Sequence, residues 1–129
     1  MKTKLVIVTI FLISLLSVTC QKHEKVYKGG PYFFDLFVGY GKPFVPAKEL
    51  SYAQSQNMDA YFMAYYDEQG RIIAFVKYLY KTFEFCDLYY YQQSGGLERV
   101  ETYKSEREKY IFIYDSNGKR IISETRSLW

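Results

Sequence analysis

Few residues in this chain could act as nucleophiles or metal ligands. There are two cysteines, Cys20 and Cys86, and a single histidine, His23. A Ser/His/Asp triad or a Cys/His pair would have to use His23, and a zinc site of the usual kind needs several His or Cys ligands. The sequence also has no glycine-rich phosphate loop and no Gly-x-Ser-x-Gly nucleophile elbow. It therefore predicts a protein that is not an enzyme and that uses no metal or other cofactor.

Paired carboxylates are the remaining catalytic option. Glu84 and Asp87 are three residues apart in a segment that predicts a strand, so we expect their side chains on opposite faces. Asp67 and Asp115 each begin a turn, where a carboxylate caps the backbone. A hydrolase is the third functional hypothesis, and it would require a polar cleft around Glu84, Asp87 and Glu101.

The N-terminal segment reads as an export signal. Lys2 and Lys4 are followed by an uncharged apolar run over 5–16, and small residues then lead to Cys20. The run is shorter than the roughly 20 apolar residues that a membrane-spanning helix needs. We predict a signal peptide over 1–19, which forms an N-terminal signal helix. A short uncleaved anchor is the alternative.

A cysteine directly after such a run resembles the lipobox of bacterial lipoproteins. The usual box has Leu three residues before the Cys and Gly or Ala just before it, whereas this chain has Ser17 and Thr19. The resemblance implies lipidation of Cys20 and attachment to a membrane of the bacterial cell envelope, facing the periplasm or the surface. The alternatives are cleavage to a secreted or periplasmic soluble protein, and a disulfide between Cys20 and Cys86.

Charge argues against a nucleic-acid partner. The formal net charge of the chain is +3, and removal of Lys2 and Lys4 with the signal peptide would lower it to +1. Lys and Arg alternate with Glu over 98–109, which is typical of a solvated strand-and-turn surface. A nucleic-acid-binding protein would be expected to carry a dense basic stripe instead.

The rest of the chain predicts a β domain. We expect a polar, lipid-anchored tether over 20–31, ending in Gly29-Gly30-Pro31, and an antiparallel β domain over 32–129. One short helix is expected over 47–56, opened by Pro46 and stopped at Asn57. Runs of aromatic and β-branched residues indicate strands at 32–40, 60–66, 71–80, 82–92, 97–103, 109–114 and 119–126. The fold class is mainly β: an antiparallel β-hairpin meander of about six to seven strands with one short α-helix.

Three turns repeat a similar pattern. Tyr66-Asp67-Glu68-Gln69-Gly70 matches Tyr114-Asp115-Ser116-Asn117-Gly118, and 91–95 is a weaker copy. The Asp caps the turn through the backbone, and the Gly adopts positive φ without strain. The Tyr before each turn is expected to face an Ile after it. The predicted structural turn residues are Asp67, Gly70, Gly95, Gly96, Asp115, Asn117 and Gly118.

Two family resemblances rest on these turns. Tyr66 to Ile72 is similar to the Tyr-Asp (YD) repeats of bacterial Rhs-type surface and toxin-shell proteins, which use the repeat structurally. Phe37-Val38-Gly39-Tyr40, followed by the segment 65–71, resembles a small uncharacterised bacterial domain over about residues 32–103. Both resemblances imply a β fold, and neither implies catalytic residues.

Aromatic side chains are the main candidates for binding. Fifteen Tyr, ten Phe and one Trp make up 20% of the chain. They favour cross-strand ladders that stiffen a sheet, and the other interpretation is an exposed platform for a protein or a glycan. The candidate binding residues are Tyr61, Tyr65, Tyr78, Tyr80, Tyr89 and Tyr91. The sequence thus predicts a small envelope lipoprotein that acts as a non-catalytic binding or structural module. The alternative is a membrane-anchored immunity or inhibitor protein against a secreted toxin.

Overall fold

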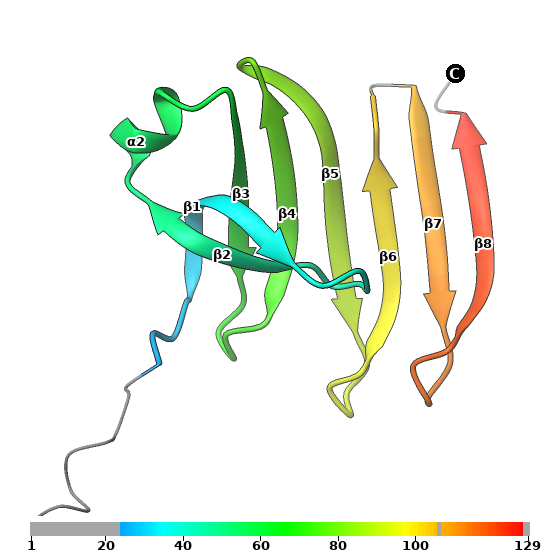
Figure 1. The fold of residues 1–129 in the computed structure, drawn as a ribbon. Helices are drawn as coiled ribbons and strands as arrows, with labels where there is room; N and C mark the ends of the chain where they lie inside the picture. The colour runs from blue at the N-terminus through cyan, green and yellow to red at the C-terminus, as the bar shows by residue number, and fades with distance from the viewer. Residues whose placement is uncertain (1–23, 106, 128–129) are drawn as a thin grey trace, which may run out of the picture.

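The computed structural model describes residues 24–105 and 107–127 (Figure 1). They form a single antiparallel sheet with the strand order β2-β1-β3-β4-β5-β6-β7-β8 and one short helix, which confirms the predicted fold class. The elements are β1 (Gly29–Val38), β2 (Val45–Leu50), α2 (Tyr52–Gln56), β3 (Ala60–Tyr66), β4 (Ile72–Leu79), β5 (Thr82–Tyr91), β6 (Leu97–Tyr103), β7 (Glu108–Tyr114) and β8 (Arg120–Ser127). The signal peptide, Cys20 and His23 lie outside the described residues.

The segment expected as a helix over 47–56 is divided between a strand and a shorter helix. Residues 45–50 form β2, which pairs with β1, and the helix runs only over Tyr52–Gln56. Ser51 is the N-cap and forms a capping box with Gln54, and the predicted stop at Asn57 is confirmed as the C-cap. Pro46 does not open a helix but lies in β2, an edge strand of the sheet, which is where a strand tolerates proline. Pairing with β1 therefore overrides helix propensity here.

The folded domain begins before residue 32, inside the segment expected as a tether. The ring of Tyr27 stacks on that of Tyr66 with a centroid distance of 5.0 Å. Gly29 pairs with Tyr66 in the ladder between β1 and β3. Gly30 has φ +148, and a Cβ there would lie 2.8 Å from the carbonyl oxygen of Ala64. Only glycine fits this close approach, so the conformation of the tether's last residues is fixed by β3.

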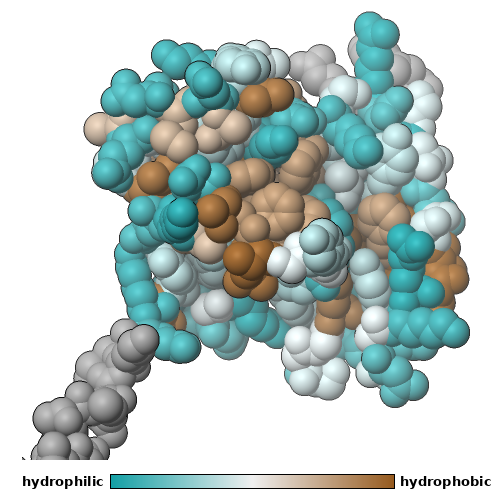
Figure 2. Space-filling view, viewed as in Figure 1, coloured by the Kyte–Doolittle hydropathy of each residue, from teal (hydrophilic) through white to brown (hydrophobic). Residues whose placement is uncertain are grey.

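The β1–β2 hairpin crosses over one face of the sheet and buries the core beneath it (Figure 1). Phe37 contacts Phe44, Phe62 and Phe75, and the rings of Phe62 and Phe75 stack at 5.1 Å. Figure 2 shows hydrophobic residues gathered near the centre of the viewed face. Covering this face removes a large aromatic area from water, which is the main stabilising contribution in a sheet of this size. The buried residues of the core are Phe34, Phe62, Ala64, Tyr66, Ile72, Phe75, Tyr89 and Val100.

The turns with an Asp at their start are built alike, as predicted. Oδ1 of Asp67 accepts hydrogen bonds from the backbone N–H groups of Gln69 and Arg71, at 3.0 and 2.9 Å. Oδ1 of Asp115 accepts them from Asn117 and Lys119, both at 2.9 Å. Gly70 and Gly118 both have φ +80.

The weaker copy of the turn makes the same two backbone hydrogen bonds as the Asp turns, whereas the residues that flank the turns differ. Gly95 has φ +97 and donates to the carbonyl of Gln92, and the carbonyl of Gly96 accepts from the N–H of Gln92. Tyr66 faces Ile72 across the first turn, as expected, but Tyr114 faces Arg120. The expected Tyr–Ile contact is therefore wrong for the last turn, because the register shifts in the same way at both turns and the position that Ile72 occupies in the first is occupied by Arg120 in the last.

The turn between β4 and β5 has no glycine. Leu79 pairs with Thr82, so Tyr80 and Lys81 form a two-residue loop, with φ 48 and φ 62. Both residues have the positive φ that this kind of hairpin turn needs and that usually selects Asn or Gly. The predicted strand over 71–80 therefore ends at Leu79, and Tyr80 lies in the turn.

Candidate functional site

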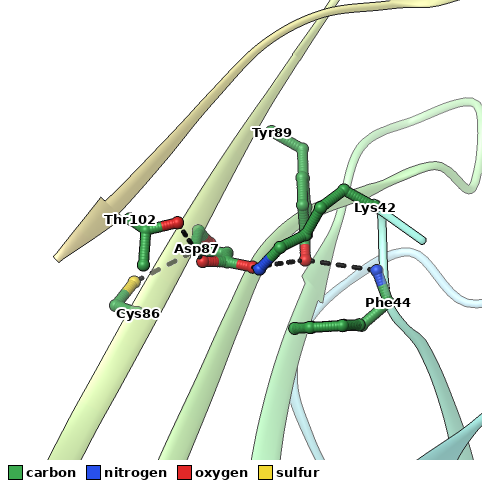
Figure 3. A network of polar contacts seen from close by, with 6 residues as sticks. All are labelled: Lys42, Phe44, Cys86, Asp87, Tyr89 and Thr102. Carbon is green, nitrogen blue, oxygen red and sulfur yellow. Dashed lines mark hydrogen bonds and ion pairs between the residues drawn. The ribbon is translucent and has the colours of Figure 1, made fainter. Parts of the chain in front are cut away.

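A buried carboxylate lies at the centre of the covered face (Figure 3). Asp87, on β5, is fully buried. Its Oδ2 accepts a hydrogen bond from the hydroxyl of Tyr89 at 2.9 Å and forms an ion pair with Nζ of Lys42. Its Oδ1 accepts a hydrogen bond from Oγ1 of Thr102 at 2.6 Å. Both carboxylate oxygens thus have partners, which a charge removed from water requires.

The covering hairpin supplies the cation of this network. Lys42 lies in the loop between β1 and β2, and its Nζ lies 3.9 Å from the ring centroid of Phe44. The hydroxyl of Tyr89 also accepts a hydrogen bond from the N–H of Phe44 at 3.2 Å. Burial, and the charge of Asp87, raise the pKa of Tyr89, so its proton stays in the bond to the carboxylate. The network therefore fastens the hairpin to β5.

A cavity of about 310 Å³ opens beside this network. Its walls combine the rings of Phe44 and Phe85 with the ammonium groups of two lysines, and its volume is near the lower end for small-ligand sites. The ring centroids of the two phenylalanines lie 6.4 Å apart. The lining residues are Lys42, Phe44, Glu84, Phe85, Thr102 and Lys104.

The position of Glu84 differs from the expectation. The register between β4 and β5 shifts so that Lys77 pairs with Phe85 and Tyr78 with Phe83, which leaves Glu84 as an extra residue. This bulge breaks the alternation of side chains. Glu84 therefore lines the same cavity as Thr102, the donor to Asp87, and forms an ion pair with Lys77 at 3.1 Å.

The six tyrosines predicted to form a binding platform are not on one surface. The rings of Tyr61 and Tyr78 stack at 5.3 Å, and Tyr61 is buried. Tyr65 is half-buried and lies on the same face of β3 as Tyr61. Tyr80 is exposed in the β4–β5 turn. Tyr89 is buried, and its hydroxyl is occupied by the Asp87 network. The half-buried Tyr91 donates a 2.5 Å hydrogen bond to the carbonyl of Ile72.

Cys86 and Glu101 belong to the other face of the sheet. Cys86 is half-buried, and burial raises the pKa of its thiol to about 11, which keeps it protonated near neutral pH. Burial also acts to raise the pKa of Glu101, but Lys109 and Arg99 outweigh it and lower this pKa. Glu101 is the centre of a charged cluster, with Nζ of Lys109 at 3.0 Å, and it does not join Glu84 and Asp87 in one cleft.

Sequence reasoning missed Lys42 and Thr102 as partners of Asp87. Asp87 interrupts an otherwise aromatic face of β5, and a lone carboxylate on such a face indicates a buried charge that needs a cation. Which cation it meets depends on the hairpin crossing over the sheet. Within 24–105 and 107–127, no group of three or more His, Cys, Asp or Glu side chains is placed to hold a metal ion. No helix in those ranges is long and apolar enough to cross a membrane.

The fold and the site define a small antiparallel β-sheet domain with an aromatic core and a hairpin held by a buried ion pair. The chain belongs to a family of unknown function, DUF6156, which matches residues 28–123. This match confirms the expected uncharacterised domain and extends it beyond 32–103 on both sides. No curated protein and no solved structure matches the chain.

Proposed function

We propose that this protein is a small envelope lipoprotein whose β domain acts as a non-catalytic binding module. The cavity beside the β1–β2 hairpin is the binding site, and its partner is a protein or a glycan of the envelope. The observation that carries this proposal is the combination of two aromatic walls, Phe44 and Phe85, with the cations Lys42 and Lys104 around one opening. Aromatic rings beside charged groups suit amphipathic partners such as peptide side chains and sugar rings.

The Asp87 network supports a binding role rather than a catalytic one. A general acid or base needs a proton that it can exchange with a substrate. Both oxygens of Asp87 are already occupied by Lys42, Tyr89 and Thr102, and the side chain has no exposed surface. The network would serve the site by holding Phe44 in place, because the Phe44 N–H is bonded to Tyr89.

The lipoprotein half of the proposal rests on the segment before the domain. The charged start, the apolar run and Cys20 have the layout of a lipoprotein signal. Attached lipid chains hold a protein firmly at a membrane when two or more are present. The few residues between Cys20 and Tyr27 would place the domain close to the bilayer surface.

Capture from envelope extract tests the binding site. The full chain serves as bait, and we expect it to retain a partner that Phe85→Ala loses. Phe83→Ala is the matched control, because Phe83 is 40% exposed and is not among the residues that line the cavity. Equal capture by both variants, with unchanged melting temperatures, would contradict the proposed site.

Membrane fractionation tests the anchor separately. Cys20→Ser should move the protein from the membrane fraction to the soluble fraction. Cys86→Ser is the control and should leave the distribution unchanged. A Cys20→Ser variant that stays with the membrane would overturn the lipoprotein proposal and leave the binding site untouched.

A further inference from the structure

The two edges of the sheet differ in how they are protected. At one edge, β2 is short, contains Pro46, and has Lys48 in the left-handed region at φ 57. A proline and a residue in the left-handed region both hinder the pairing of another strand with this edge. At the other edge, β8 is eight residues long and contains neither Pro nor Gly. Its backbone is thus suited to pair with another strand.

The side chains of β8 are also uncovered. Every residue from Arg120 to Ser127 is exposed, including Ile121 at 56% and Ile122 at 45%. In Figure 1, β8 lies at the far side of the sheet from the covering β1–β2 hairpin, and no other drawn element lies beyond it. Long edge strands that carry no Pro or Gly and that no other element covers can accept a further strand.

The charges of β8 favour a second copy of the same strand as the occupant. In a symmetric antiparallel pair, one residue lies opposite its own copy. Centring the pair on Ile122 places Arg120 of each chain opposite Glu124 of the other and brings the two Ile122 side chains together. Opposite charges and apolar pairs at facing positions both stabilise antiparallel strands.

Other symmetric registers are less favourable. Centring on Ser123 places Arg120 opposite Arg126, and centring on Glu124 places the two carboxylates opposite each other. Like charges at facing positions destabilise a strand pair. Centring on Thr125 pairs Glu124 with Arg126 and places Ile122 and Ile121 opposite positions 128 and 129, which lie outside the described residues. Within the described residues of β8, the Ile122 register is the one of these four that both pairs opposite charges and brings two isoleucine side chains together.

We infer that two copies of this protein associate through antiparallel pairing of their β8 strands, in the register centred on Ile122. The two sheets then continue as one across the two-fold axis. The contact is isologous, so it closes after two copies. It lies at the opposite edge of the sheet from β2 and does not use the cavity, so it is independent of the proposed binding site.

A charge-swap series tests this inference with the full chain in detergent. Sedimentation should show a concentration-dependent dimer for the unmodified chain. Glu124→Arg places like charges opposite each other twice and should weaken self-association about tenfold. Adding Arg120→Glu to that variant restores opposite charges and should restore the dimer. Glu98→Arg, a charge reversal of the same kind on β6, should leave it unchanged.

Cysteine cross-linking tests the register. Under mild oxidation, Ile122→Cys should give a disulfide-linked dimer above the background of the unmodified chain, because the two Cβ atoms would lie opposite each other. Glu124→Cys should not give this dimer, because position 124 of one chain would lie opposite position 120 of the other and away from its own copy. A chain that stays monomeric at every concentration overturns the inference. So do equal yields from the two cysteine variants or a double charge swap that fails to restore the dimer.

Discussion

The hydroxyl of Tyr89 lies 2.9 Å from Oδ2 of Asp87, two residues earlier on the same face of β5. The same hydroxyl accepts the N–H of Phe44 from the covering hairpin. The phenol of Tyr89 thus links a buried carboxylate to the backbone of Phe44, which is 45 residues from Tyr89 in sequence. Because Lys42 makes an ion pair with the same carboxylate oxygen, two polar contacts that meet at Asp87 hold the hairpin over the core.

Removal of the buried carboxylate should destabilise the fold strongly. Asp87→Ala leaves the Lys42 ammonium, 22% exposed, without its counter-ion and leaves two hydroxyls without their acceptor. Loss of one partner of a buried pair costs about 3 kcal/mol. Urea denaturation should show this decrease in the free energy of unfolding. Glu84→Gln breaks only the partly exposed pair with Lys77 and should cost less than about 1 kcal/mol. Similar losses for both variants would contradict a structural role for Asp87.

Stability should fall in alkali because of buried tyrosines. Burial raises the pKa of Tyr66 and of Tyr91 from 10.0 to about 12 in the folded protein. A group whose pKa is higher in the folded state contributes stability that is fully present below the unfolded value and is lost as pH rises through the folded value. The free energy of unfolding should therefore decrease between pH 10 and about 12. Tyr91→Phe should reduce this decrease, as measured by urea denaturation at each pH. A decrease of the same size in that variant would contradict the assignment.

The last turn requires glycine at position 118 because of its backbone conformation and not because a side chain would clash. Gly118 has φ +80, and a Cβ there would meet nothing within 4 Å. Gly118→Val should therefore cost about 1 to 2 kcal/mol through left-handed backbone strain alone. Thermal melting of this variant should be compared with that of Gly96→Val. Gly96 is equally open but does not have a φ in the left-handed range. Equal melting temperatures for the two variants would contradict the requirement for positive φ at Gly118.

Local sequence patterns predicted the hairpin meander because each hairpin is set by neighbouring residues. Asp67 and Asp115 bond the backbone two and four residues ahead, so the turn chemistry is complete within five residues. The predicted strands left a break between β4 and β5 at residue 81, but the inclusion of Tyr80 in the turn was missed because Tyr80 and Lys81 adopt positive φ without a glycine or asparagine. Strand β2 escaped it because Ala47 and Glu49 are ordinary helix formers that pair instead with β1.

The sequence by itself determined the strand count to within one or two, the positions of three turns and the aromatic character of the core. These features depend on residues close together in the chain. Only the tertiary structure decided that Lys42 meets Asp87, that the predicted tyrosine platform is divided among separate surfaces, and that β8 is left uncovered. Each of these depends on the β1–β2 hairpin crossing over β3 to β5, a contact between segments far apart in sequence that no local pattern encodes.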